Sequence, residues 1–184
     1  MPENSIVNWN ARAAMAELLA LSFRHPGAEL AEAVHSGEWT DAANEIASAL
    51  GIAVELEDGL ANGCADAAEL EELLRREATR LFVGVPEPAV SPYEGVRRCA
   101  EDGMDALMFV NRYSVAVERY FGECGLGRSR DANDPLDHVA TELELMEYLA
   151  AMAAGIAKAP ERELPGGSAA AAYERFVAEH AMLW

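Results

Sequence analysis

Residues 134–153 of the chain read DPLDHVATELELMEYLAAMA, and this stretch decides the class of fold. Its apolar side chains return every three or four residues, a spacing that places them on one face of an α-helix: Leu136, Val139, Leu143, Met146, Ala150 and Ala153. Asp134 is the expected N-cap, with Pro135 in the first turn, where a missing backbone N–H costs nothing. We therefore expect a helix that starts at Asp134 and buries one face.

Helical periodicity also covers most of the remaining chain. The other expected helices span about 8–24, 28–35, 40–50, 66–82, 102–122 and 168–182, and segments rich in glycine or proline separate them. Residues 102–122 are apolar nearly all round, which is typical of a helix with neighbours on most sides. The sequence predicts an all-α fold, a single bundle of about seven helices around a central apolar helix, with residues 1–184 in one domain.

The composition excludes several classes of partner. The 184 residues include 32 acidic and 14 basic side chains, so the formal net charge is −18, which repels nucleic acid and anionic membrane surfaces and favours a basic partner. With 51% apolar residues the chain is too hydrophobic for a disordered acidic tail. No apolar run predicts a membrane span, and residues 1–10 lack the pattern of an export signal. Cys64, Cys99 and Cys124 have no metal-type spacing, so we expect reduced thiols in a cytoplasmic protein.

His138 is placed close enough to carboxylates for a binding or catalytic role. Helical spacing brings His138, Glu142 and Leu145 to one face, just after Asp137 in the expected first turn. A histidine beside a carboxylate can hydrogen-bond a ligand, transfer a proton or bind a metal; the alternative is a capping aspartate with a surface histidine. No di-iron, zinc, nucleophile or phosphate-loop motif occurs, so we expect no catalytic residue, metal or cofactor. The rival hypothesis is a small helical metal-binding protein or enzyme that uses His138 and Glu142.

Two further segments are suited to recognition or to packing. In the loop after Leu81 and Phe82, prolines hold Tyr93 and Glu94 in a fixed conformation, which favours binding because little entropy is lost; alternatively, Tyr93 fills the core at a crossover. Near the C-terminus, side chains four residues apart share a helical face, and packing against the bundle is expected for them: Phe176, His180 and Trp184.

Together these segments resemble the TorD/DmsD/NarJ family of redox-enzyme maturation chaperones, which includes nitrate reductase delta subunits. The shared features are Leu-Phe at a helix end, a loop rich in glycine and proline that ends Pro-Tyr-Glu, an acid-Pro-x-Asp-His followed by Glu-Leu-x-x-Met, and a closing Phe-x-x-x-His-x-x-x-Trp. In this chain they occupy residues 81–82, 84–94, 134–138 with 142–146, and 176–184. The resemblance extends from about Arg80 to the C-terminus.

The resemblance implies an all-helical cytoplasmic protein without enzymatic activity. Such proteins bind the precursor of a molybdopterin-containing oxidoreductase of anaerobic respiration, often at a twin-arginine signal peptide, and prevent its export until the cofactor is inserted. Carried over to this chain, the binding surface comprises Leu81, Phe82, Pro92, Tyr93, Asp137 and His138. Glu94, Asp134 and Glu142 join it as neighbouring carboxylates, because arginine pairs with a carboxylate through two hydrogen bonds. The pattern fits a monomer and a domain-swapped dimer equally, and it leaves open the client oxidoreductase and nucleotide binding.

Overall fold

The structure, a computed structural model, describes residues 7–56, 61, 63–84, 88–104, 110–127 and 135–183. Within these ranges every regular element is helical, and the only β-type pairing is an isolated bridge between Tyr93 and His138. The helices are α1 (Trp9–Phe23), α2 (Ala28–Ser36), α3 (Glu38–Leu50), α4 (Ala67–Ala78), α5 (Glu94–Glu101), α6 (Arg112–Glu123), α7 (Val139–Ala153) and α8 (Ala169–Glu179). Shorter turns are η1 (Thr79–Val83), η2 (Pro165–Gly167) and η3 (Ala181–Leu183). The expected all-α fold is confirmed.

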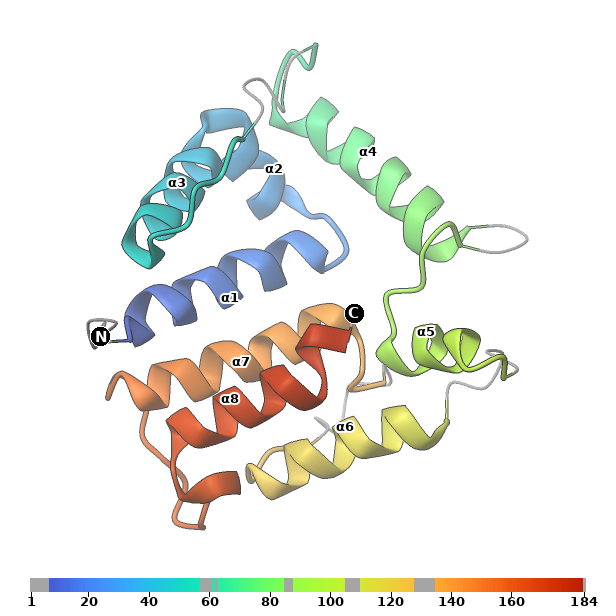
Figure 1. The fold of residues 1–184 in the computed structure, drawn as a ribbon. Helices are drawn as coiled ribbons and strands as arrows, with labels where there is room; N and C mark the ends of the chain where they lie inside the picture. Colours follow the sequence, from blue (N-terminus) through green and yellow to red (C-terminus); the bar gives the residue numbers. More distant parts are fainter. Residues whose placement is uncertain are drawn as a thin grey trace.

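Helices α1 and α7 lie side by side in the middle of the molecule (Figure 1) and form its most extensive helix–helix contact. Ala13 and Ala16 of α1 belong to the same buried cluster as Leu149 and Ala150 of α7. Because alanine side chains are small, the two helix axes can approach closely. Helix α3 packs against α1 on one side of this pair and α8 packs against α7 on the other, while α4 contacts α2 and α5 contacts α6.

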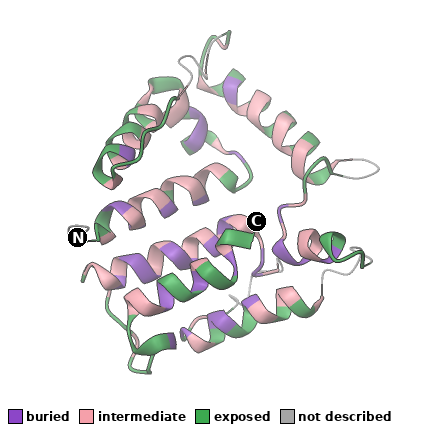
Figure 2. Cartoon of the chain, in the orientation of Figure 1, coloured by how far each residue is buried: buried purple, intermediate pink, exposed green. Residues whose placement is uncertain are grey.

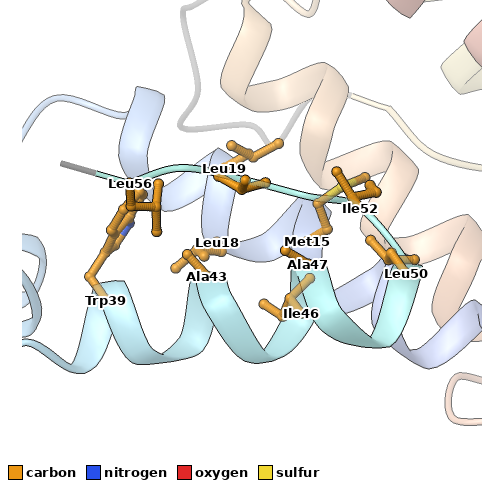
Figure 3. A pocket seen from close by; sticks show the side chains of 11 residues that line it. Met15, Leu18, Leu19, Trp39, Ala43, Ile46, Ala47, Leu50, Ile52 and Leu56 are labelled. Carbon is orange, nitrogen blue, oxygen red and sulfur yellow. The ribbon is translucent and has the colours of Figure 1, made fainter.

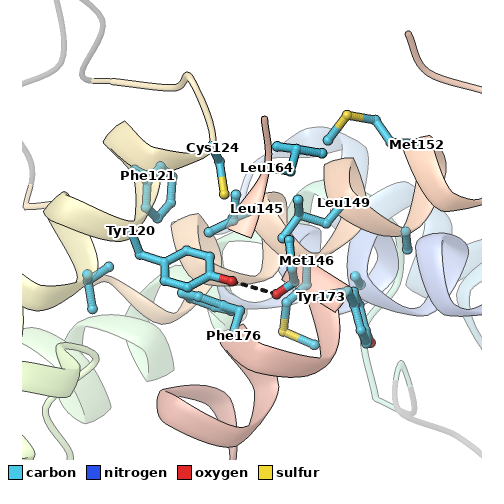
Figure 4. Packing of buried hydrophobic residues seen from close by; sticks show 14 of the residues in the cluster. Tyr120, Phe121, Cys124, Leu145, Met146, Leu149, Met152, Leu164, Tyr173 and Phe176 are labelled. Atoms are coloured by element: carbon cyan, nitrogen blue, oxygen red, sulfur yellow. Dashed lines mark hydrogen bonds between the residues drawn. The ribbon is translucent and has the colours of Figure 1, made fainter. Parts of the chain in front are cut away.

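The main apolar core joins α6, α7 and α8 to one face of α1 (Figure 4). Figure 2 shows the buried residues concentrated along α7. The rings of Tyr120 and Phe176 lie 5.2 Å apart, and the Tyr120 hydroxyl donates a hydrogen bond to the carbonyl oxygen of Ala172 at 2.7 Å. The aromatic ring therefore stays in the apolar core while its one polar atom is satisfied.

The central helix is not the one that the sequence predicts. The expected helix over 102–122 is interrupted, because Gly103 turns the chain with a φ of +69° and Asn111 caps a new helix, α6. The Asn111 side chain accepts the Ser114 N–H and the Ser114 hydroxyl accepts the Asn111 N–H, a capping box hidden inside an apolar run. Residues 105–109 of the expected helix lie outside the described ranges. The helix at the centre is α7, with seven buried residues against three in α6.

The start of α7 also differs from the prediction. The helix begins at Val139, and its N-cap is His138, whose Nδ1 atom accepts the Ala140 N–H at 3.2 Å. Asp137 therefore precedes the helix, and the proposed capping residue Asp134 lies outside the described residues. The prediction failed because long-range contacts of Asp137, described below, hold its backbone out of the helix.

Of the other predicted helix boundaries, some are confirmed and some are wrong. The Asp66 cap of α4 is confirmed, since its side chain accepts the Glu69 N–H at 2.9 Å. Helix α5 was not expected, and α8 ends at Glu179 rather than near residue 182, with buried His180 as its C-cap. Packing of the C-terminal segment against the bundle is confirmed for Phe176 and His180, whereas Trp184 is outside the described residues.

The three cysteines differ in their expected reactivity. Cys99 and Cys124 are buried and Cys64 is partly exposed. Burial raises the pKa of the Cys124 thiol to about 11, and the nearby Glu123 carboxylate raises it further. Because the thiolate is the reactive form, we expect only Cys64 to react rapidly with an alkylating reagent at neutral pH in the folded protein, and all three thiols after unfolding. Mass spectrometry of the alkylated protein checks this, and rapid labelling of folded Cys124 would contradict it.

Candidate functional site

A pocket of about 160 Å³ lies where several chain segments meet. Its walls come from the end of α1, the end of α4 with η1, and the residues that precede α5 and α7: Phe23, Arg24, His25, Ala78, Phe82, Val83, Pro92, Tyr93 and His138. The rings of Phe23 and Phe82 lie 6.4 Å apart and join the first of these segments to the second. Most lining residues are apolar or aromatic, and the polar side-chain groups are the Arg24 guanidinium, the Tyr93 hydroxyl and the imidazoles of His25 and His138.

The end of α4 positions Phe82. The helix continues into the wider turn η1, in which the Gly84 N–H donates to the Thr79 carbonyl oxygen at 2.8 Å, five residues back. Val90 lies beside this turn, since its N–H donates to the Leu81 carbonyl oxygen at 2.9 Å. This turn ends the helix with Phe82 at the pocket wall.

A short backbone bridge joins the two motif segments that lie more than 40 residues apart. The Glu94 N–H donates to the Asp137 carbonyl oxygen at 3.0 Å, and the Val139 N–H donates to the Pro92 carbonyl oxygen at 2.9 Å. The bridge brings the rings of Tyr93 and His138 into an edge-to-face contact at 5.3 Å. The two residues therefore form one continuous wall of the pocket.

A buried ionic cluster supports this wall. Glu94 is 1% exposed and His180 is 4% exposed. The Glu94 carboxylate accepts hydrogen bonds from the Arg98 guanidinium and from His180 Nδ1, the latter at 2.9 Å. Burial alone would raise the pKa of Glu94, but the hydrogen bonds from His180 and Arg98 outweigh burial and lower it. The start of α5 is thereby tied to the end of α8.

Asp137 also supports the wall formed by Tyr93 and His138, through a contact with the start of α5. Its Oδ2 atom accepts the Gly95 N–H at 3.0 Å, and its carboxylate is 1% exposed. A Cβ atom at position 95 would lie 2.6 Å from the Asn111 side chain and 2.8 Å from Asp137 Oδ2, so any larger residue has to displace both side chains. Glu142, one turn into α7, is 2% exposed beneath the bridge. These carboxylates lie below the pocket rather than on its surface.

The accessible acids beside the pocket belong to α1 and α7. Arg24 pairs with Glu144 at 2.6 Å between Nη2 and Oε1. The Arg24 side chain is 54% exposed and the Glu144 side chain is 40% exposed. Partial burial raises the pKa of the Glu147 carboxyl, and the nearby carboxylates of Glu17 and Glu144 raise it further. Three carboxylates that repel one another favour the approach of a cation.

The site does not have the layout of a metal centre. Among the residues that the structure describes, no group of three or more His, Cys, Asp or Glu side chains is arranged to hold a metal ion. His138 and Glu142, the residues of the rival hypothesis, also have other roles here, since His138 Nδ1 accepts a backbone N–H and Glu142 is buried. A pocket of about 160 Å³ is also smaller than the sites of about 300–1,000 Å³ that hold drug-sized molecules, so it suits a few side chains of a peptide.

The conserved pattern of the nitrate reductase delta subunit family matches residues 29–184 of the sequence. The chain belongs to this family. Proteins of the nitrate reductase delta subunit family are chaperones of molybdoenzyme maturation, so the resemblance drawn from the motifs is confirmed. Neither the curated proteins nor the solved structures contain a match to the chain. No helix in the described ranges has the length and apolar character needed to cross a membrane.

In this nitrate reductase delta subunit family member, the residues predicted for the site fall into four groups. Phe82, Pro92, Tyr93 and His138 line the pocket. Leu81 is adjacent, with its carbonyl oxygen bonded to the returning loop. The buried carboxylates of Glu94, Asp137 and Glu142 support the pocket from beneath. Asp134 lies outside the described ranges.

Sequence reasoning missed the contribution of α1. Phe23, Arg24 and His25 reach the pocket from a segment more than 50 residues before Phe82, and the sequence shows their stretch only as the end of a helix. The Glu94–His180 pair was missed as well, because 86 residues separate its members. A local signal existed for Ala78 and Val83, since both flank the Leu-Phe motif.

Proposed function

We propose that the chain is a cytoplasmic, non-enzymatic chaperone that binds the precursor of a molybdopterin-containing oxidoreductase at the pocket beside His138. The observation that supports this most directly is the bridge between Tyr93 and His138, which unites two distant motif segments in one wall opposite Phe23 and Phe82. Helix ends and loops form the wall, whereas the buried cluster beneath it is rigidly hydrogen-bonded. Such a preformed site loses little entropy on binding.

The chemistry of the pocket and its rim suits a twin-arginine signal peptide or a similar basic and apolar segment of the apoprotein. An apolar side chain of the peptide fills the pocket beside the Phe23 and Phe82 rings. Its arginines meet the partly exposed carboxylates of Glu147 and of Glu144, because the surface pair of Glu144 with Arg24 exchanges partners more easily than the buried contacts of Glu94 with Arg98 and His180. The net charge of −18 accelerates the encounter with such a segment. A bound signal peptide is withheld from export until the cofactor is inserted.

Peptide binding tests this proposal. The probe is a fluorescent synthetic peptide with two consecutive arginines before an apolar stretch, and fluorescence anisotropy reports its affinity. We expect Phe82→Ala and His138→Ala each to weaken binding about tenfold, because each removes a wall of the pocket. The double variant Glu144→Gln, Glu147→Gln should weaken binding and reduce its salt dependence, because it removes two partly exposed negative charges.

Two controls accompany the assay. Glu161→Gln with Glu163→Gln removes two exposed acids from the segment before η2 and should leave the affinity near that of the native chain. Unchanged affinity in Phe82→Ala and His138→Ala, with the helical circular dichroism retained, would reject the pocket as the binding site. Stoichiometric metal that is lost with His138→Ala would instead favour the metal-binding rival.

A further inference from the structure

A second, wholly apolar groove of about 200 Å³ lies between α1, α3 and the segment 52–56 (Figure 3). It shares no lining residue with the pocket at His138. Met15, Leu18 and Leu19 come from α1, and the segment 52–56 crosses over the two helices without forming regular structure. At the rim, Ile52 is 49% exposed and Val54 is 45% exposed.

The groove offers nothing but apolar contact. The one polar side-chain atom among its lining residues is the Trp39 indole N–H, and it donates to Ser22 Oγ at 3.0 Å. An apolar site without hydrogen-bonding groups does not hold ordered water well. Its volume is below that of the pockets that enclose drug-sized molecules. The ligand part that fits is therefore one or two bulky apolar side chains of a larger partner.

The segment that contains α2, α3 and residues 52–56 of the groove carries charges of a single sign. From His25 to Leu74 the sequence contains twelve acidic residues and no lysine or arginine. Six of these acids lie in α2, in α3 and beside the groove, and no ion pair joins any of them to a cation in the described ranges: Glu29, Glu32, Glu38, Asp41, Glu45 and Glu55. Among the other acids of this stretch, Glu71 pairs with Arg75. The field of these six carboxylates attracts a cationic partner.

We propose that the α1–α3 groove is a docking surface for an amphipathic protein segment that is apolar on one face and rich in lysine or arginine on the others. The apolar face fills the groove beside Ile52 and Val54, and the basic residues meet the acidic surroundings. A second copy of this chain is disfavoured as the occupant, since it would bring equally acidic surfaces together. Anionic lipid is disfavoured for the same reason.

Two synthetic probes test the groove. The first is an amphipathic helix of about 18 residues with leucine on one face and lysine on the other, and the second has glutamate in place of every lysine. The groove variant is Ile52→Ser with Val54→Ser. Its matched control, Ile156→Ser with Val110→Ser, makes the same two changes at exposed positions elsewhere. Anisotropy of each labelled probe gives the affinity, and circular dichroism checks the fold.

We expect the lysine probe to bind the native chain, the groove variant to lose about tenfold in affinity, and the matched control to keep it. Ala43→Leu fills the groove instead of opening it and should also weaken binding. It replaces the serine variant as the test if that variant does not fold. Equal binding by the groove variant and its control would overturn the proposal, as would equal binding of the glutamate probe. A dimer of the native chain that the groove variant converts to monomer in sedimentation would overturn it too.

The two surfaces are separable in the same experiments. The proposal goes beyond the function proposed above, because the twin-arginine probe is expected to bind the groove variant with unchanged affinity. If that probe is lost with Ile52→Ser and Val54→Ser, the groove is not a separate docking surface. If the twin-arginine probe binds nowhere while the lysine probe behaves as expected, the function at His138 fails and the groove stands.

Discussion

Gly95→Ala is expected to lower the free energy of unfolding by about 2–4 kcal/mol, because the new methyl group displaces two side chains that are both hydrogen-bonded. Its Cβ would lie 2.6 Å from the Asn111 side chain and 2.8 Å from Asp137 Oδ2. Both are terminal atoms of side chains, but neither is free to move. Asn111 caps α6 by accepting the N–H groups of Tyr113 and Ser114, and Asp137 accepts the N–H of residue 95 itself.

Gly122→Ala is the matched control for this prediction. Gly122 lies inside α6, and a Cβ there meets no atom within 4 Å. The same substitution should therefore leave stability unchanged or raise it by up to about 1 kcal/mol, because alanine favours the helix over the unfolded chain. Urea unfolding followed by circular dichroism measures both variants. Equal stability of the two would show that position 95 is not closely packed. Because Gly95 lies two residues after Tyr93, we also expect Gly95→Ala to bind the twin-arginine probe more weakly.

Glu94→Gln is expected to lower the free energy of unfolding by about 2–3 kcal/mol at neutral pH, because it removes the charge from a buried ion pair. His180 and Arg98 lower the pKa of Glu94 beneath its ordinary value of 4.5, against the opposing effect of burial. A carboxyl whose pKa is lower in the folded state stabilises that state above the unfolded pKa. This contribution is lost as the pH falls through the folded pKa. The difference between the native chain and Glu94→Gln should therefore shrink in acid.

The chain offers close controls for this pair. Glu101, also in α5, pairs with Arg97 at 3.3 Å on the exposed surface, so Glu101→Gln should change stability by less than about 1 kcal/mol. His180→Asn should retain more stability than His180→Ala, because the asparagine amide nitrogen can donate near the position of Nδ1. A stability difference for Glu94→Gln that does not depend on pH would contradict the ionised state of Glu94.

Elements that depend on neighbouring residues were predictable. The 3–4 spacing of apolar residues located most of the helices, and the Asp66 cap followed from a side chain and an N–H three residues apart. The prediction of a central helix over 102–122 failed because the capping residues Asn111 and Ser114 lie within a stretch that is otherwise rich in apolar residues. The delayed start of α7 could not be predicted, since the bonds that hold Asp137 come from residues 94 and 95.

The sequence by itself determined the helical class, the family and the motif residues, because periodicity, capping and motif order are all local along the chain. Only the tertiary structure decided how those residues divide between surface and interior. Tyr93 and His138 reach a pocket, whereas Glu94 and Asp137, their immediate neighbours in the sequence, are buried. The reason is physical: a buried carboxylate needs hydrogen-bond donors, and those donors, His180 and the Gly95 N–H, come close only when α5, α7 and α8 pack together.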